Sequence, residues 1–310
     1  MDKLRAMKMF VRVVEAGSFS AVARENATTQ SAVSKQVVGL ERALGARLLA
    51  RTTRSLALTE EGQAYFAQAR RLVDDVEEAE SAVRAASHQL SGWLRIAGSV
   101  AFGRLVLLPI VQRFLAAHPL VKVDLRLADA FVDLTEQGID VGIRIGELAS
   151  SSMIARNVGT TRRLVLAHRD LVREMKRRGR AGVPQTPDDL HRHSCILYTE
   201  LTTGSEWHFV AGPGADAPAG TRVAVVVNGS LRTNSSEVVR AGVLANLGIG
   251  YAPEWLFDEE LRRGEVVALM PKWTPPPIPL HLVSPPARRH SAKVKAFGDL
   301  VAAAFAKRAT

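Results

Sequence analysis

Residues 29–36 read Thr29-Gln30-Ser31-Ala32-Val33-Ser34-Lys35-Gln36, and this stretch decides the fold of the first part of the chain. Helical spacing of the apolar residues predicts one helix, capped by Thr28 or Thr29 and ended by Gly45. Its buried seam comprises Val33, Val37, Leu40 and Leu44. The other face carries short polar side chains, one amide and one cation near the helix N-terminus. Such a set suits base edges and phosphates in a DNA major groove.

Two shorter helices precede this one. Apolar residues recur at helical spacing from Leu4 to Val14, and Gly17 ends that helix. Ser18 is placed to cap a second helix over residues 19–25. Together, the three helices predict a small, all-α amino-terminal domain.

A basic turn follows between two short strands. Segments 48–50 and 55–58 flank the turn Arg51-Thr52-Thr53-Arg54. We expect a hairpin whose arginines reach phosphates or the minor groove, where the negative potential favours cations. Residues 1–59 carry a net charge of +6. The residues alone leave one alternative open, a helical domain with a solvated polar face and ordinary surface arginines.

A family resemblance rests on several motifs: Gly17-Ser18-Phe19-Ser20-Ala21-Val22-Ala23, residues 29–36, Leu40-Glu41 with Leu44-Gly45, Leu48-Leu49, Arg51-Thr52-Thr53-Arg54 and Leu58-Thr59-Glu60-Glu61-Gly62. In order and spacing they resemble the winged helix-turn-helix of LysR-type transcriptional regulators. The resemblance implies double-stranded promoter DNA as a partner, with contacts from Thr29, Gln30, Ser31, Ser34, Lys35, Arg51, Thr52 and Arg54. One departure is Ser31, which stands where many members have a proline that presets the first helical turn.

Residues 60–90 predict a long linker helix with a net charge of −4. Thr59 opens it, and Glu60 and Glu61 complement the helix dipole in the first turn. A heptad seam predicts packing against another helix: Tyr65, Ala69, Leu72, Val76, Ala79, Val83, Ala86 and Leu90. Packing of this seam onto its own chain is the alternative. The resemblance implies that the helix dimerises and that dimers build tetramers, so that two recognition helices meet two half-sites.

From Ser91 onward, expected strands alternate with expected helices, which predicts an α/β architecture with mostly parallel sheets. The expected strands span residues 93–97, 121–127, 140–145, 163–167, 194–198, 222–227, 248–252 and 280–284. The expected helices span residues 105–117, 132–137, 170–177, 235–244 and 292–306. Residues 275–277, three prolines, predict a stiff connector.

Three phrases in this region also carry the resemblance: Gly92-Trp93-Leu94-Arg95-Ile96, residues 138–146 and Gly248-Ile249-Gly250-Tyr251 with Pro253. They resemble the family's effector-binding domain, which is similar to periplasmic binding proteins. The resemblance implies two lobes, about 91–164 with 267–310 and about 165–266, around a ligand cleft. The expected fold is therefore an all-α winged helix-turn-helix domain over 1–59, a linker helix over 60–90 and an α/β two-lobe domain over 91–310.

Polar residues at the ends of the expected strands are candidates for this cleft. The expected effector-binding residues are Ser99, Phe102, Arg144, Tyr198, Thr202, Asn234 and Ser235. Hydroxyl and backbone N–H groups at a helix N-terminus hold anions, and an arginine pairs with a carboxylate. Plain helix capping by the polar residues, and an internal pair of Arg144 with Glu147, are the alternatives. The net charge of +8 over residues 91–310 favours a small organic anion.

Composition sets the broad class. The chain has 310 residues, 47% apolar and 23% charged, as is typical of a globular protein of two or three domains. Its first ten residues mix charged and apolar residues, so we expect no secretory signal and a cytoplasmic location. Arginines interrupt the most apolar stretches, so no membrane span is predicted. The net charge of +10 points to polyanionic or acidic partners.

Catalytic and metal functions are not favoured. Cys195, the single cysteine, lies near His191 and His193. In a strand His193 and Cys195 would share a face, with their side chains fixed by sheet packing and no third ligand evident. No phosphate-binding glycine loop or nucleophile elbow occurs. We interpret Cys195 as structural, with a redox-sensing thiol as the alternative, and expect neither metal nor cofactor. Three function classes remain: a transcription regulator, a solute-binding module without a DNA role, and a Cys195-dependent enzyme or thiol switch. The basic first sixty residues favour the regulator.

Overall fold

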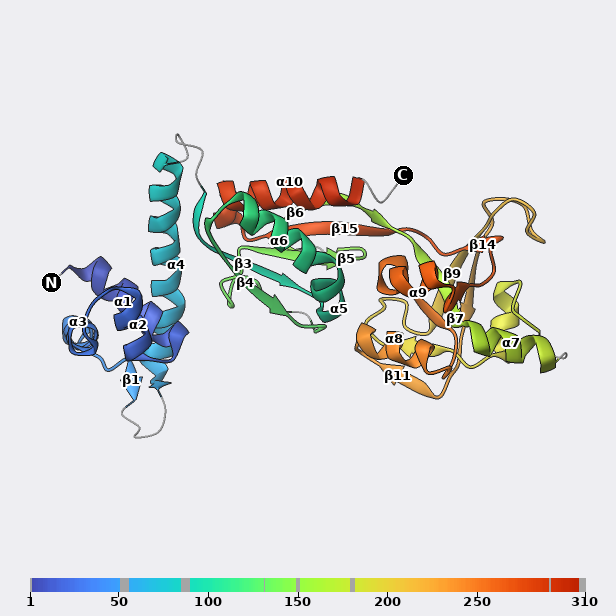
Figure 1. The fold of residues 1–310 in the computed structure, drawn as a ribbon, viewed down its shortest axis with the longest axis horizontal. Coiled ribbons are helices and arrows are strands. Elements are labelled where there is room, and N and C mark those ends of the chain that lie inside the picture. Colours follow the sequence, from blue (N-terminus) through green and yellow to red (C-terminus); the bar gives the residue numbers. More distant parts are fainter. Residues whose placement is uncertain are drawn as a thin grey trace. The chain divides into compact units, whose positions relative to one another are not determined.

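The computed structural model describes residues 2–50, 56–84, 90–130, 132–148, 151–178, 182–289 and 291–306. The chain forms two compact units, one comprising Met1–Gly92 with Asp133–Gly138 and the other Trp93–Val132 with Ile139–Thr310. Figure 1 shows the elements of each unit. A helical amino-terminal domain is followed by an α/β domain, which confirms the predicted fold class.

The amino-terminal domain is built on three helices, α1 (Lys3–Ala16), α2 (Phe19–Glu25) and α3 (Gln30–Leu44). Gly17 and Gly45 follow α1 and α3 in the left-handed conformation, with φ of 62° and 68°. Glycine is favoured there because other residues pay a steric penalty. The predicted ends of both helices are confirmed.

Side-chain caps fix where the second and third helices begin. The Ser18 hydroxyl accepts a hydrogen bond from Ala21 N, and the Thr29 hydroxyl accepts one from Ala32 N, each at 3.2 Å. Each cap satisfies a backbone donor that the first helical turn leaves without a partner. The apolar seam of α3 then packs inward, with its buried members being Val33, Val37 and Leu40.

A short antiparallel hairpin, β1 (Leu49–Ala50) with β2 (Ala57–Leu58), follows α3. Glu41 of α3 holds its first strand, because one carboxylate oxygen accepts hydrogen bonds from Leu48 N at 2.8 Å and from Leu49 N at 3.1 Å. The hairpin is thereby tied to the same helix that carries the polar face. Its tip, residues 51–55, lies outside the described residues.

The long helix α4 (Glu60–Arg84) begins at the predicted position. The Thr59 hydroxyl caps it by accepting from Gly62 N at 2.9 Å, and donates to Arg47 O at 2.6 Å.

The first part of the predicted heptad seam packs onto its own chain. Ala69 is fully buried, and the Tyr65 ring lies 5.7 Å from the ring of Phe10 in α1. Val73 is also buried in this core, whereas the seam residue Leu72 is 53% exposed. At the beginning of α4, the seam therefore packs against the protein's own amino-terminal domain, as the alternative interpretation predicts. The seam position Ala86 lies outside the described residues.

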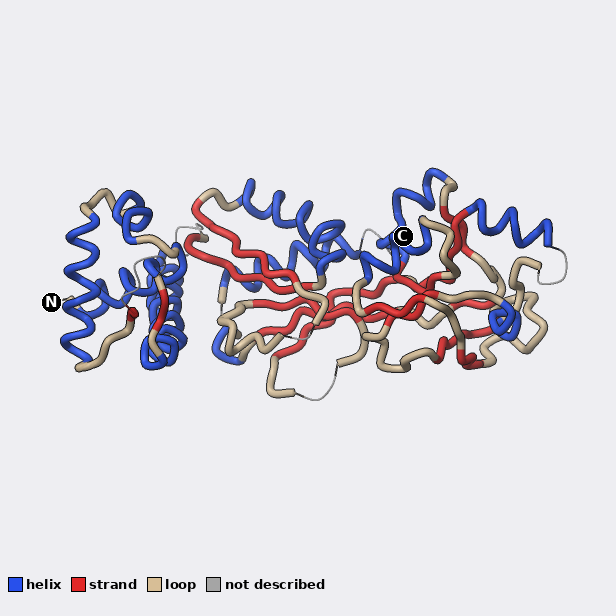
Figure 2. The backbone as a smooth tube through the Cα atoms, turned by 90° about the horizontal axis from the view of Figure 1, so that it is seen from below, coloured by secondary structure: helices blue, strands red, loops and turns tan. Residues whose placement is uncertain are grey.

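The first lobe of the α/β unit contains a five-stranded sheet in the order β4-β3-β5-β15-β6. Its strands are β3 (Ser91–Gly98), β4 (Leu120–Leu127), β5 (Val141–Ile145), β6 (Ile154–Thr161) and β15 (Ile278–Ser284). Strands β3 and β5 are parallel, but β15 runs antiparallel to both of its neighbours. In Figure 2 the strands, in red, are flanked by helices, in blue.

Helical residues 100–117 and the last helix pack together in this lobe. They comprise α5 (Val100–Phe102), a π-helical turn (Gly103–Leu107), α6 (Leu108–Ala117) and α10 (Ala292–Ala306). The rings of Phe114 and Phe297 are 5.4 Å apart between α6 and α10. Residues 100–117 have the length and apolarity of a membrane span, with a mean hydropathy of 1.6. They pack as a core helix of the lobe, because Phe102, Leu107 and Phe114 are buried.

The second lobe contains three small sheets. Their orders are β12-β7-β13, β11-β8 and β10-β9-β14. The strands are β7 (Arg163–His168), β8 (Ile196–Tyr198), β9 (Glu206–Ala211), β10 (Arg222–Val226), β11 (Leu231–Thr233), β12 (Gly250–Pro253), β13 (Val266–Ala268) and β14 (Trp273–Thr274). The helices are α7 (Arg169–Arg178), α8 (Ser236–Leu244) and α9 (Asp258–Arg263), with 3-10 turns at Pro187–Arg192 and Glu254–Phe257. The chain passes between the lobes twice, from β6 to β7 and through prolines 275–277 from β14 to β15.

Three expectations about this unit need correction. The sheets are mixed rather than mostly parallel, because β15 and most second-lobe strands pair antiparallel. Residues 132–137 form turns rather than a helix, since the Asp133 carboxylate accepts from Thr135 N and Glu136 N and so competes with helical hydrogen bonds. Strand β14 pairs with β9, so residues 273–274 belong to the second-lobe sheet and not to the first lobe.

We expect Gly62→Ala to destabilise the amino-terminal domain. A Cβ atom at position 62 would lie 1.9 Å from Leu48 O, a backbone atom that the hairpin holds in place. The cost of such overpacking is about 1–3 kcal/mol in the free energy of unfolding, measurable by denaturant titration. Gln63→Ala, at the exposed neighbouring position, is the control and should stay within about 0.5 kcal/mol of the parent. Equal stabilities of the two variants would contradict the close approach.

Candidate functional site

The polar face of α3 is open to solvent. Thr29, Gln30, Ser31 and Lys35 are exposed, and Ser34 is half-buried. The structure therefore places the predicted residues on one end of one helix. The hairpin residues predicted with them, Arg51, Thr52 and Arg54, lie outside the described residues.

Hydrogen bonds order the side chains at the start of α3. The Ser20 hydroxyl of α2 donates to Gln30 Oε1 at 3.0 Å, and the Thr29 and Ser31 hydroxyls lie 3.0 Å apart. With its carbonyl oxygen engaged, the Gln30 amide still has its N–H donors for another partner. Ser31 thus joins the cap of α3 through a hydrogen bond in the place where a proline would preset the turn.

A groove borders this face and adds a residue that the sequence did not single out. Ser34 and Glu41 of α3, Ser18 before α2 and Ala50 of β1 line it together with Arg47. Arg47 is exposed and precedes the hairpin, so it adds a positive charge to the groove that Ser34 also lines. Only the packing of the hairpin against α3 reveals this position.

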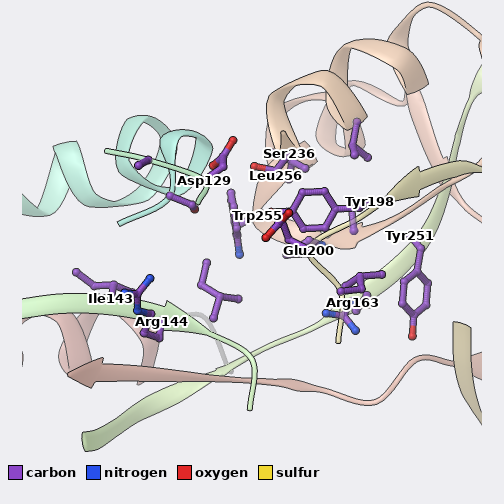
Figure 3. Close-up of a pocket in the computed structure, with 17 residues that line it drawn as sticks. Asp129, Ile143, Arg144, Arg163, Tyr198, Glu200, Ser236, Tyr251, Trp255 and Leu256 are labelled. Atoms are coloured by element: carbon purple, nitrogen blue, oxygen red, sulfur yellow. The ribbon is translucent and has the colours of Figure 1, made fainter. Parts of the chain in front are cut away.

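The second site is a pocket of about 270 Å³ in the α/β unit, lined by residues of both lobes. The first lobe contributes Ser99, Asp129 and Arg144, and the second lobe contributes Arg163 and Tyr198. The remaining polar or aromatic lining residues are Glu200, Ser236, Tyr251 and Trp255 (Figure 3). A concave, mixed polar and apolar pocket of this kind is typical of a small-molecule site.

The structure brings together some of the predicted effector residues and separates others. Ser99, Arg144 and Tyr198 line the pocket, whereas Phe102, Thr202, Asn234 and Ser235 do not. Phe102 is fully buried behind the wall, with its ring 5.1 Å from that of Trp255. Thr202 and Asn234 are exposed, and the next residue after Ser235, Ser236, supplies the hydroxyl at the pocket.

The helix N-terminus near Ser99 is already occupied by a carboxylate of the chain. Asp129 Oδ1 accepts a hydrogen bond from Val100 N at 3.0 Å, and the Ser99 hydroxyl makes no capping bond. The backbone donor that the sequence assigns to a ligand anion is thus satisfied internally. Plain capping by Ser99 is therefore not found, and the Val100 N–H is not open to a ligand anion.

Two arginines carry positive charge into the pocket. The Arg163 guanidinium lies 4.9 Å from the centre of the Tyr251 ring, a cation–π contact. Arg144 donates to Val132 O at 3.0 Å, and burial lowers the pKa of its guanidinium. An arginine stays charged despite such a shift, so both groups are cationic at neutral pH.

Two carboxylates carry negative charge into the same pocket. Burial, followed by the charges of Asp129 and Glu200, raises the pKa of Tyr198 to about 12. The Tyr198 hydroxyl therefore stays protonated and available as a donor at neutral pH. The sequence did not single out Asp129, Glu200, Arg163 or Trp255, because no local motif distinguishes them from surface or core residues.

Cys195 is buried in an environment that disfavours the reactive thiolate form. Burial raises the pKa of its thiol to about 12, and burial, as the largest cause, lowers the pKa of His193. The residue forms an isolated parallel bridge with Ile249 inside the second-lobe core. Among the described residues, no group of three or more metal-ligating side chains is found. The environment supports the structural interpretation over a redox-sensing thiol.

Two family models match the chain. The model described as bacterial regulatory helix-turn-helix protein, lysR family, matches residues 4–63. The model described as LysR substrate binding domain matches residues 87–306.

Relatives match over nearly the whole chain. The HTH-type transcriptional regulator YhjC of Escherichia coli is 34% identical, covering 96% of both chains. The HTH-type transcriptional activator AaeR of Escherichia coli is 31% identical over 91% of this chain and 87% of its own. The solved structure of CrgA, a LysR-type regulator from Neisseria meningitidis, is 28% identical, covers 97% of this chain and 98% of its own, and gives a TM-score of 0.59. The AphB structure from Vibrio cholerae, at 23% identity and a TM-score of 0.56 over 96% and 98% of the two chains, shares the fold.

We expect Cys195 to resist alkylation in the native protein. A thiol with a pKa of about 12 is almost entirely protonated in mildly alkaline buffer, and burial blocks the reagent. Labelling by iodoacetamide, followed by mass spectrometry, should be slow in the folded state and complete in denaturant. Rapid labelling of the folded protein would contradict this and revive the thiol-switch alternative.

Proposed function

We propose a mechanism for this chain, which belongs to the LysR family of DNA-binding transcriptional regulators. Proteins of this family are regulators and not enzymes. In our proposal the protein acts in the cytoplasm, binds promoter DNA as a homo-oligomer and is switched by a small organic anion in the cleft. The observation that carries the DNA-binding mode is the exposed polar end of α3 in a domain of net charge +6.

The proposed DNA contacts divide into two kinds. The exposed Gln30 amide, which keeps its N–H donors, is suited to read a base edge in the major groove. Lys35, exposed on the same helix, is suited to a phosphate, and we place Ser31 and Ser34 beside them. Thr29 keeps its role as cap and holds the helix end in position. Arg51, Thr52 and Arg54 belong to the proposed contacts of the hairpin tip.

We propose that self-association uses the outer side of α4. Leu72, a residue of the heptad seam, is 53% exposed on this helix. An exposed leucine in such a seam indicates a surface that a second helix covers. Two copies joined there present two recognition helices to two half-sites. Assembly of such dimers into a tetramer is part of the same proposal.

We propose that the effector acts by bridging the lobes. The pocket takes its lining from both lobes, so a ligand that touches both stabilises one arrangement of the lobes over another. Arg144 and Arg163, one from each lobe, are the groups suited to its anionic end. A population shift of this kind couples the cleft to DNA binding.

We expect Gln30→Ala and Lys35→Ala to impair DNA binding differently. Gln30→Ala should relax the preference at one base pair by about 1–3 kcal/mol. Lys35→Ala should weaken binding evenly over all sequences and reduce the slope of log affinity against log salt by about one. Gel-shift competition with point-mutated DNA from upstream of its own gene measures both.

Lys176→Ala, at an exposed lysine of α7 in the other unit, is the control and should bind like the parent. Equal losses on all sequences for Gln30→Ala would refute base reading by this residue. Salt-independent binding by the parent protein would refute the phosphate contacts.

We expect Leu72→Asp to dissociate the dimer. A carboxylate in an apolar helix–helix seam is left without a partner and without water. Light scattering coupled to gel filtration should report a lower mass for this variant, while its circular dichroism spectrum stays that of a folded protein. Gln63→Asp, at an exposed position on the opposite side of α4, is the matched control and should keep the parent mass. An unchanged mass for Leu72→Asp would remove this face from the proposed interface.

A further inference from the structure

One apolar side chain interrupts the polar face of α3. Val38 is 37% exposed, and among the residues of α3, all of which the structure describes, it is the only large apolar one that is exposed. Gln30, Ser34 and Val38 follow one another at intervals of four residues, so they form one row along the helix. Val38 therefore belongs to the same surface as the residues for which we propose DNA contacts.

Neither the core nor the stability of the helix accounts for a valine at this position. The buried residues of α3 are Val33, Val37 and Leu40, and Val38 lies outside this seam. Valine is also a poorer helix former than alanine, because its branched Cβ restricts the side chain. A face that stays in water gains nothing from this valine, whereas a face that meets another surface gains the burial of its two methyl groups.

The exposed neighbours of Val38 on the helix are cations. Lys35 lies three residues before it and Arg42 four residues after it, and both are exposed. Glu41, the nearby acid, has a carboxylate oxygen engaged by the backbone of the hairpin. The domain as a whole carries a net charge of +6 over residues 1–59. A partner that fits this surface is an anion that also displays an apolar group between its charges.

Duplex DNA has this combination in its major groove. The phosphates supply the charges, and the C5-methyl of thymine is the apolar group among the base edges. A branched side chain in a helix keeps one dominant rotamer, so the methyl groups of Val38 are held in place before any contact. Gln30 and Val38 are about 12 Å apart along the helix axis, and base pairs are about 3.4 Å apart. A thymine met by Val38 thus lies within about four base pairs of the base that Gln30 reads.

We propose that Val38 reads the C5-methyl group of a thymine in the major groove. This inference rests on the proposed function and adds to it a specificity-determining residue that acts by apolar contact, whereas Gln30 acts by hydrogen bonds. In this arrangement Lys35 and Arg42 bind phosphates on either side, and the valine between them meets the base edge. A cytosine at the same position lacks the methyl group and leaves the valine without its contact.

Uracil substitution in the DNA isolates this contact, because uracil lacks only the C5-methyl group of thymine and forms the same base pair. The full-length protein is titrated with duplex from upstream of its own gene, in which each thymine in turn is replaced by uracil. We expect one thymine in each half-site at which the replacement weakens binding about three- to fivefold, as for the loss of one buried methyl-sized group. This thymine should lie within about four base pairs of the pair at which Gln30→Ala relaxes the preference.

Val38→Ala assigns the effect to this residue. Alanine removes the two methyl groups and is the better helix former, so α3 keeps its structure, as circular dichroism would show. The variant should bind the thymine duplex about three- to fivefold more weakly than the parent, and it should not distinguish thymine from uracil at that position. Val226→Ala changes a valine that is 51% exposed in β10 of the other unit. It is the matched control and should keep the parent ratio of thymine to uracil affinity.

The uracil scan separates this inference from the function on which it rests. If the parent binds the duplex and no uracil substitution weakens binding, the methyl contact is overturned and the regulator stands. An equal loss in the parent and in Val38→Ala also overturns it, because another group then reads the methyl. A lower mass for Val38→Ala in light scattering assigns the valine to self-association and overturns the contact. Failure of the parent to bind the duplex even at low salt overturns the proposed function itself.

Discussion

Buried polar atoms require hydrogen-bond partners, and this requirement acts differently on the two functional surfaces of the protein. In the amino-terminal domain the chain supplies the partners itself, as when Glu41 holds the backbone of β1. In the first lobe, Asp140 pairs with Arg288 at 2.9 Å in the core. In the cleft, the Ser236 hydroxyl and the Trp255 indole face the pocket without a partner from the described chain. The same rule thus leaves the amino-terminal surface internally satisfied and the pocket with polar atoms that the described chain does not satisfy.

In the proposed mechanism, the two connections between the lobes let a small ligand change the arrangement of the lobes. Because the chain passes from β6 to β7 and returns through prolines 275–277, two short connections join the lobes. The ion pair of Arg104 with Glu237, at 2.8 Å, also joins them, but both side chains are partly exposed and such pairs contribute little. Apolar packing also joins the lobes, since the rings of Phe102 in the first lobe and Trp255 in the second are 5.1 Å apart. In the proposed mechanism, a ligand that contacts both lobes adds to these contacts and so favours one lobe arrangement.

Local features were predictable where neighbours in sequence decide them. The caps at Ser18 and Thr29, the glycine ends at Gly17 and Gly45, and the start of α4 all depend on groups within one helical turn. Strand β6 was not predicted, because its residues are mostly polar or exposed and its pairing with β15 supplies what the local pattern lacks. Mixed sheet directions escaped prediction for the same reason, since alternation of strands and helices does not fix which strands become neighbours.

The sequence by itself determined the helices of the amino-terminal domain, the polar face of α3 and the family, because these depend on spacing within short stretches. Tertiary structure alone decided that Leu72 stays outside the core and Ala69 inside, because the packing of α1 selects the buried side of α4. It alone also gathered Asp129, Arg163 and Trp255 around one pocket. These residues come from distant segments of two lobes, and no local pattern records a meeting that happens only when the lobes fold against each other.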